Sequence, residues 1–267
     1  MIFDTHAHLD TFLKNGTLPQ VLKRAKDAGI GGIIACSTKP EEWDMYESIS
    51  KDSRGFVNWQ AGIHPSELSA SDLDLMPKLE NLFLEDSPNS PCAMGEIGLD
   101  FYRLPKDAIQ AERVKIAQLE LFRRQLEIAA KHRLKICVHA RNAVGECTEE
   151  IIAAGVDLSN VVFHCYGGTV EELKKINSLG GRASFTGVIT YKGADEMREA
   201  MLAQGTSKLM FESDCPYLSP EPKRGERNEP AYVPFTVKFA AELFVLAPDK
   251  LAAITTHNAR EFFGLTA

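Results

Sequence analysis

The sequence predicts an α/β fold, a (β/α)₈ TIM barrel. Short β-branched or apolar runs alternate with longer amphipathic segments almost from end to end of the 267 residues. Eight strand–helix units fill about 250 residues in such a barrel. The expected strands are Ile2–His6, Gly32–Ser37, Val57–Ile63, Cys92–Leu99, Lys135–His139, Val161–Cys165, Ala183–Ile189 and Lys208–Glu212. The expected helices are Leu18–Ala28, Glu41–Lys51, Leu73–Leu84, Lys106–Lys131, Ala143–Ala154, Val170–Leu179 and Asp195–Gln204.

Local signals support these elements in turn. In the longest helix, Ile116, Leu119 and Leu126 recur among charged residues at a spacing that forms one buried stripe. Gly29 and the Gly180-Gly181 pair stand where a helix should stop before a strand.

The number of domains is predicted from the segments that interrupt the alternation of strands and helices. A doubly wound sheet also alternates strands and helices, but no glycine-rich dinucleotide fingerprint follows the first strand. The segment Ser219–Pro234 is rich in proline and charge, and we interpret it as a long loop after strand eight. The tail Thr255–Phe263 is expected to be a capped helix whose two phenylalanines pack back. No low-complexity linker divides the chain, so one domain over residues 1–267 is predicted.

Composition limits the class of protein. Thirty basic against 37 acidic side chains give a formal charge of −7, which argues against a protein that coats nucleic acid. No stretch approaches the roughly 20 apolar residues of a membrane span. The chain runs from Met1 straight into a strand-like segment without a signal peptide, so we expect a cytosolic protein. Its six scattered cysteines, none in a CxxC pair, are expected to be reduced thiols.

Histidines and acids cluster where the predicted strands end. In a barrel the carboxyl ends of the strands build the active site. His6 and His8 are two apart on an extended strand, so both side chains leave the same face and could share a metal ion. A pair of partly exposed polar residues is the simpler interpretation. Together the strand ends supply six nitrogen and oxygen ligands suited to two ions such as Zn²⁺ or Mn²⁺: His6, His8, Glu96, His139, His164 and Asp214.

The two acids could carry distinct roles. Glu96 lies between Gly95 and Gly98, which let the backbone approach a ligand closely, and its two oxygens could bridge two metals. Asp214 could both ligate a metal and accept a proton from an attacking water. The alternatives to these roles are structural: Glu96 would be an ordinary glutamate at a strand end, and Asp214 a turn aspartate before Pro216.

Other candidate groups have structural explanations. His132 ends a helix and His257 is expected to start the last one, so both are interpreted as structural. No cysteine has a base at a spacing that suggests a nucleophile, and no GxSxG elbow is present.

The whole chain resembles the TatD-like metal-dependent deoxyribonucleases, within the amidohydrolase-type barrels. The resemblance rests on seven blocks in order: Asp4-Thr5-His6-Ala7-His8-Leu9-Asp10, Gly62-Ile63-His64-Pro65, Gly95-Glu96-Ile97-Gly98-Leu99-Asp100, Val138-His139-Ala140-Arg141, Phe163-His164-Cys165-Tyr166-Gly167-Gly168, Glu212-Ser213-Asp214-Cys215-Pro216-Tyr217-Leu218 and Arg227-Asn228-Glu229-Pro230.

This resemblance implies a site of two divalent ions, Zn²⁺, Mn²⁺ or Mg²⁺. One ion would be held by His6, His8, Glu96 and Asp214; the other by Glu96, His139 and His164, with Glu96 bridging. His64 would face the substrate, and Arg103 and Arg141 are candidate phosphate contacts because guanidinium groups match phosphate oxygens. Surface ion pairing is the alternative role for both arginines.

The implied activity is phosphodiester hydrolysis by metal-activated water, as a 3′-5′ exonuclease or DNase on single-stranded DNA. DNA would be a transient substrate of a monomer, with no stable nucleic-acid complex and no membrane partner. Ser66, Cys215 and the Tyr166-Gly167-Gly168 run depart from the usual family pattern, which bears on substrate preference. A small-molecule amidohydrolase or phosphoesterase on the same barrel, or a metal-binding protein without turnover, are the alternatives.

Overall fold

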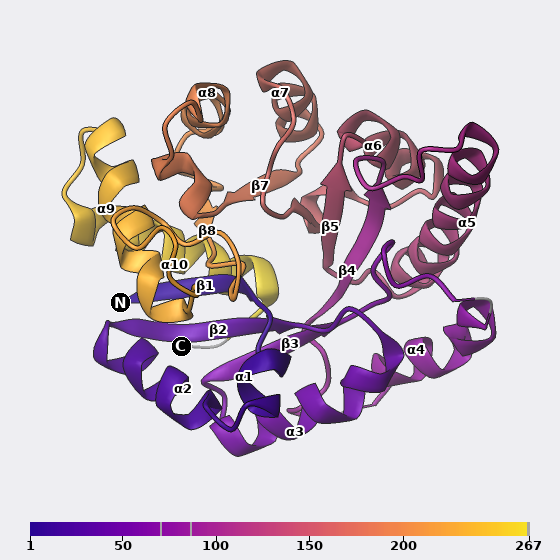
Figure 1. The fold of residues 1–267 in the computed structure, drawn as a ribbon, viewed down its shortest axis with the longest axis horizontal. Coiled ribbons are helices and arrows are strands. Elements are labelled where there is room, and N and C mark those ends of the chain that lie inside the picture. The colour runs from indigo at the N-terminus through magenta and orange to yellow at the C-terminus, as the bar shows by residue number, and fades with distance from the viewer. Residues whose placement is uncertain (70, 86, 266–267) are drawn as a thin grey trace.

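The computed structural model describes residues 1–69, 71–85 and 87–265, which form an eight-stranded parallel barrel surrounded by helices (Figure 1). The predicted fold class is confirmed. The strands are β1 (Ile2–Ala7), β2 (Ile30–Cys36), β3 (Val57–Ala61), β4 (Ala93–Asp100), β5 (Ile136–Arg141), β6 (Val161–Phe163), β7 (Arg182–Phe185) and β8 (Met210–Phe211). The helices are α1 (Asp10–Lys14), α2 (Leu18–Asp27), α3 (Trp43–Ser53), α4 (Met76–Leu82), α5 (Ala108–His132), α6 (Val144–Ala153), α7 (Val170–Ser178), α8 (Asp195–Gln204), α9 (Val233–Leu243) and α10 (Pro248–Phe263).

The strands pair in chain order, each parallel to the next. The last gap closes at the carboxyl ends, where Ala7 bridges Cys215 in parallel register. There the His8 N–H donates to the Cys215 carbonyl at 2.8 Å, and the Asp214 N–H donates to the His6 carbonyl at 2.9 Å. Closure of the barrel therefore fixes the backbone of three candidate metal ligands.

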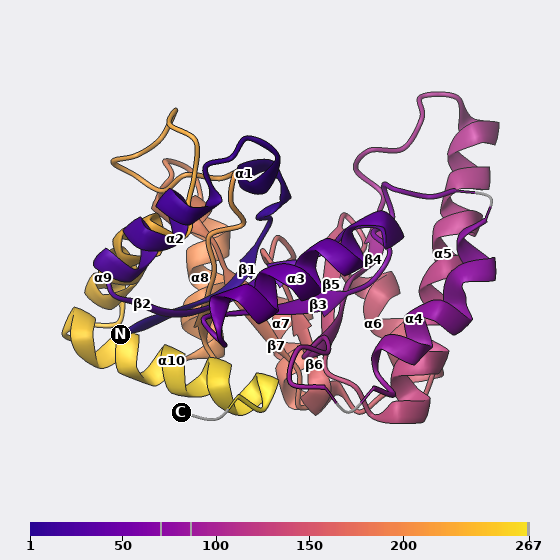
Figure 2. The same cartoon turned by 90° about the horizontal axis from the view of Figure 1, so that it is seen from below.

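Both faces of the strands are buried, as expected of a parallel sheet covered by helices. All eight residues of β4 are buried. At the amino ends of the strands, Phe262 and Phe263 of α10 pack with Phe3 and Met210 and close the barrel. Figure 2 shows α10 along one end of the molecule and the loop after β8 at the opposite end. The polar end of the barrel thus stays open.

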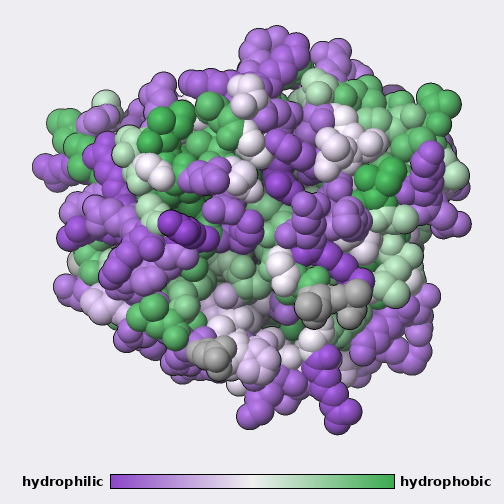
Figure 3. Space-filling model, turned by 180° about the vertical axis from the view of Figure 1, so that it is seen from behind, coloured by the Kyte–Doolittle hydropathy of each residue, from purple (hydrophilic) through white to green (hydrophobic). Residues whose placement is uncertain are grey.

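The molecular surface seen in Figure 3 is mostly hydrophilic, with separate apolar patches between the polar side chains. Among the described residues, no single helix is long and apolar enough to cross a membrane. The segments Pro230–Leu243 and Pro248–Phe263 pass that test only as a pair, with a bend of 111° between them.

Several predicted boundaries were wrong. The expected strand Ala183–Ile189 ends at Phe185, because the chain turns into a 3₁₀ helix at Gly187, where a Cβ would lie 2.6 Å from the Leu218 carbonyl oxygen. The expected loop Ser219–Pro234 ends early: a 3₁₀ helix starts at Pro230 and α9 at Val233. Proline in the first turn of a helix needs no N–H partner, so Pro234 does not exclude α9.

The terminal helix was also placed too late in the sequence. It begins at Pro248, and His257 lies inside it rather than at its start. Thr255 resembled a cap, but its hydroxyl donates to the Leu251 carbonyl within the helix at 3.1 Å. The short helix α1 was not predicted at all.

Glycines allow β4 to lie close to β5 beside Glu96. A Cβ on Gly98 would lie 2.0 Å from the His139 carbonyl oxygen. The backbone φ of Gly98 is +144°, a value that residues with a side chain rarely adopt. A Cβ on Gly95 would lie 2.7 Å from that of Cys137.

We therefore expect Gly98→Ala to lower the free energy of unfolding by about 3 kcal/mol or more, because strain and backbone contact add. Chemical denaturation of the metal-free protein measures this loss. Gly55→Ala is the control: it has a φ of +83° and open space around its Cβ, so we expect a loss of only about 1 kcal/mol. Equal losses in the two variants would show that close packing of β4 on β5 contributes little to the free energy of unfolding.

A buried acid lies beneath the open end of the barrel. Asp4 in β1 is fully buried, and its Oδ1 accepts from the N–H groups of Ser213 at 2.8 Å and His6 at 3.3 Å. Its Oδ2 has no partner within the described part of the chain. Burial raises the pKa of Asp4 to about 7 from its ordinary 3.8.

The unfolded chain releases this proton near pH 3.8 and the folded chain near pH 7, so stability falls as pH rises between them. We expect Asp4→Asn to stabilise the protein relative to wild type, with the gain growing by roughly 2–3 kcal/mol between pH 5 and pH 8. Denaturation at both pH values measures it. Asp52→Asn at an exposed position of α3 controls for replacing a carboxylate by an amide. A gain that shrinks at pH 8 would contradict the argument.

Candidate metal centre

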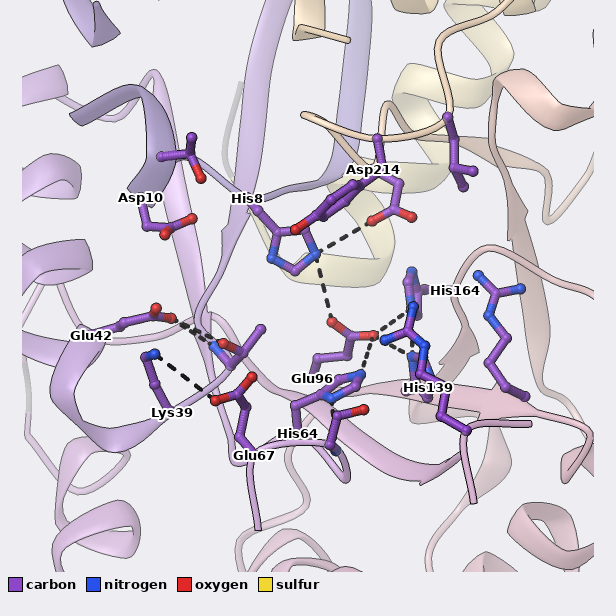
Figure 4. A pocket seen from close by; sticks show the side chains of 17 residues that line it. His8, Asp10, Lys39, Glu42, His64, Glu67, Glu96, His139, His164 and Asp214 are labelled. Atoms are coloured by element: carbon purple, nitrogen blue, oxygen red, sulfur yellow. Dashed lines mark hydrogen bonds and ion pairs between the residues drawn. The ribbon is translucent and has the colours of Figure 1, made fainter. Parts of the chain in front are cut away.

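The predicted site residues come together at the open end of the barrel. They line a cavity of about 470 Å³, which includes His8, His64, Glu96, Arg103, His139, Arg141, His164 and Asp214. His6 is fully buried just beneath, with its Nε2 3.3 Å from the Nε2 of His8. Figure 4 shows the imidazoles of His8, His64, His139 and His164 converging on Glu96.

One oxygen of Glu96 faces the donors of β1. The Oε2 atom lies 3.4 Å from His6 Nε2 and 3.8 Å from His8 Nε2. The Oδ1 atom of Asp214 lies 3.3 Å from the same nitrogen of His8 and 4.0 Å from that of His6. Four donors, from β1, from β4 and from the segments that follow β1 and β8, thus surround one space.

The other oxygen faces the donors of β5 and β6. The Oε1 atom lies 2.6 Å from His139 Nδ1 and 2.6 Å from His164 Nε2. His64 brings its Nε2 to 3.4 Å from the same oxygen, while its Nδ1 accepts the Ser66 N–H at 3.0 Å. The two oxygens of one carboxylate therefore meet two different sets of nitrogens.

Electrostatics keep this carboxylate ionised. Burial opposes the charge, yet His164, His64 and His6 outweigh it and hold the pKa of Glu96 well below its usual range. Burial likewise opposes protonation of His164, but the charge of Glu96 and the nearby carboxylate of Glu212 raise the pKa of His164 well above its ordinary value. Asp214 also has a lowered pKa: burial opposes ionisation, and His8 and the other histidines outweigh it.

This donor set suits divalent cations. Imidazole nitrogens at 3.3 Å, as between His6 and His8, cannot both carry protons without repulsion, whereas a cation between them satisfies both lone pairs. Imidazole and carboxylate ligands suit Zn²⁺ and Mn²⁺. The residues present therefore fit a resident metal.

Three buried polar residues support the imidazoles from behind, and the sequence analysis missed all of them. Gln60 Nε2 lies 3.1 Å from His6 Nδ1, Glu212 Oε1 lies 3.4 Å from His164 Nδ1, and Asp100 Oδ2 lies 3.3 Å from His139 Nε2. Partners of this kind fix the ring orientation of histidine ligands. Asp100 is the last residue of β4 and Glu212 directly follows β8. Both lie within the motif blocks, and this position was the signal that could have identified them.

The two arginines lie near the β5 and β6 donors. Arg141 donates through Nη1 to the Cys165 carbonyl at 3.3 Å, directly after His164. Arg103 has its Nε 3.8 Å from the Oδ2 of Asp100. Both line the cavity and are available to an anion there.

The remaining histidines lie outside the cavity lining. His132 ends α5, with its Nε2 2.5 Å from Glu80 Oε1. His257 is exposed, with its Nε2 3.7 Å from Glu261 Oε2.

Comparison with known proteins identifies the family. The profile described as "TatD related DNase" matches residues 3–264. The chain is 30% identical to the uncharacterized metal-dependent hydrolase YabD of Bacillus subtilis, over 98% of this chain and 99% of YabD. It is 33% identical to the 3′-5′ ssDNA/RNA exonuclease TatD of Erwinia billingiae, over 93% of each chain.

A solved structure agrees with these matches. The TatD homolog YJJV of Escherichia coli superposes with a TM-score of 0.86 at 25% identity, over 99% of this chain and 98% of YJJV. The chain therefore belongs to the TatD-related DNase family of metal-dependent hydrolases.

Proposed function

We propose that the protein hydrolyses phosphodiester bonds as a 3′-5′ exonuclease on single-stranded DNA, with two divalent ions (Zn²⁺, Mn²⁺ or Mg²⁺) as cofactors. The observation that carries the proposal is the division of ligands between the two oxygens of Glu96. Two relatives at 33% and 34% identity are named 3′-5′ ssDNA/RNA exonucleases.

The proposed ligands follow the two donor sets. His6, His8 and Asp214 would share one ion with Glu96 Oε2. His139 and His164 would share the other with Glu96 Oε1. When bound, divalent cations neutralise charge on a phosphate and lower the pKa of water. Their positive charge would also help a protein with a net charge of −7 to bind a polyanion.

The surrounding side chains would bind and orient the DNA. Arg103 and Arg141 would hold phosphate oxygens, and His64 faces the same cavity. The carboxylate of Asp214, which stays ionised despite its burial because the neighbouring histidines lower its pKa, would accept the proton of the attacking water. The P–O3′ bond then breaks, releasing a 5′-mononucleotide, and the shortened strand keeps a 3′-hydroxyl after protonation from solvent.

Association with DNA would be transient, in keeping with the negative net charge. A monomer and a cytosolic location remain predictions from the sequence.

We expect purified protein supplied with Mg²⁺, Mn²⁺ or Zn²⁺ to shorten 5′-labelled single-stranded DNA stepwise from the 3′ end. Asp214→Asn should lower the rate by about 10²- to 10⁴-fold, because the proton acceptor and a ligand are lost together. Gel analysis of product ladders measures both. Asp52→Asn on α3 is the matched control and should retain the ladder.

A chelator should abolish cleavage and metal should restore it. Wild-type protein that is loaded with metal but leaves all DNA intact would contradict the nuclease proposal. Turnover of bis(p-nitrophenyl) phosphate in that case would favour a phosphoesterase of small molecules.

A further inference from the structure

The two flanks of the active-site cavity carry opposite charge. The segments that follow β1, β2 and β3 contribute Asp10, Lys39, Glu42 and Glu67 to the lining. Figure 4 shows these four side chains gathered on one side of His8 and His64. The loop after β4 and the end of β5 contribute only arginines to the lining beyond the proposed metal ligands.

The first flank, defined here as the acidic flank (Asp10, Glu42 and Glu67), is only partly neutralised. Lys14 Nζ meets Asp10 Oδ2 at 2.8 Å, and Lys39 Nζ lies 3.9 Å from Glu67 Oε2. Glu42 is buried, and its Oε2 accepts from the Thr38 N–H at 3.0 Å and hydroxyl at 3.2 Å. Within residues 1–69, 71–85 and 87–265, no cation forms an ion pair with Glu42.

The opposite flank is positive. Arg141 contacts the Cys165 carbonyl beside His164, and Arg103 lies 3.8 Å from Asp100, which in turn lies 3.3 Å from His139. Both guanidinium groups therefore stand next to the donors of Glu96 Oε1. Asp10, in contrast, follows His8 by two residues, next to the donors of Glu96 Oε2.

The two sides of this cavity therefore differ in how strongly they attract the phosphates of a polyanion. Phosphates that approach Arg103 and Arg141 are attracted, whereas phosphates that approach the acidic flank are repelled. A carboxylate accepts hydrogen bonds from hydroxyl groups, so this flank suits an uncharged sugar with a free hydroxyl.

We propose that the acidic flank recognises the free hydroxyl end of the strand. The terminal nucleoside lies against Asp10 and Glu42, the scissile phosphate lies at Glu96, and the following phosphates run past the two arginines. This inference rests on the proposed function, under which the recognised group is the 3′-hydroxyl. A terminal phosphate, or a strand without ends, is excluded by charge.

The test compares kcat/KM for three DNA strands of one sequence: linear with a 3′-hydroxyl, linear with a 3′-phosphate, and circular. We expect the wild-type enzyme to prefer the hydroxyl end by about tenfold or more, since a dianion would meet the acidic flank. The circular strand should not be cut.

Variants of the acidic flank then locate the source of this preference. Glu42→Gln keeps an acceptor for Thr38 but removes the charge, and should reduce the hydroxyl-to-phosphate ratio by about three- to tenfold. Asp10→Asn should act in the same direction and keeps the test informative if the buried position 42 does not tolerate change. Exposed Glu41→Gln, outside the cavity lining, is the matched control and should leave the ratio within about twofold of wild type.

Equal rates on both linear ends, cleavage of the circle, or a wild-type ratio in both Glu42→Gln and Asp10→Asn would each overturn the inference while leaving the nuclease intact. No cleavage of any DNA would overturn the proposed function and this inference with it.

Discussion

The buried carboxylate of Glu96 is the constraint around which the open end of the barrel is arranged. A negative charge this deep is costly unless it is compensated. Here the compensation comes from imidazoles supplied by four strands or strand ends, with distances of 2.6–3.8 Å to its oxygens. The barrel brings these strand ends to one point, and each contributes one or two side chains at its carboxyl end.

The same constraint explains the glycines and the closure of the barrel. Gly95 and Gly98 bring β4 against β5, so Glu96 and His139 can meet at 2.6 Å. The backbone bonds between β1 and the segment around Asp214 close the other side of the centre. Behind the imidazoles, Gln60, Glu212 and Asp100 are positioned to fix ring orientation. His6, Glu96 and His139 are thus held within strands, and the other proposed ligands lie just beyond the ends of β1, β6 and β8.

Much of this arrangement could be predicted from the sequence, because alternation of strands and helices is local. The helix Asp195–Gln204 was predicted with its observed ends. Irregular segments at the rim were not, since an apolar run that ends in a 3₁₀ turn, as at Gly187, resembles a longer strand. In the site, strand-end histidines and acids were visible as a pattern. Gln60 was not, because its partner His6 is distant in sequence. The acidic flank was not either, because only the folded barrel brings Asp10, Glu42 and Glu67 to one side of the cavity.

The most direct test of the account is where metal binds. Anomalous diffraction from crystals grown with Mn²⁺ or Zn²⁺ would locate each ion without reference to activity. The account predicts two peaks, one within about 2.0–2.3 Å of each oxygen of Glu96, flanked respectively by His6 and His8 and by His139 and His164. A single peak, or peaks remote from Glu96, would contradict it.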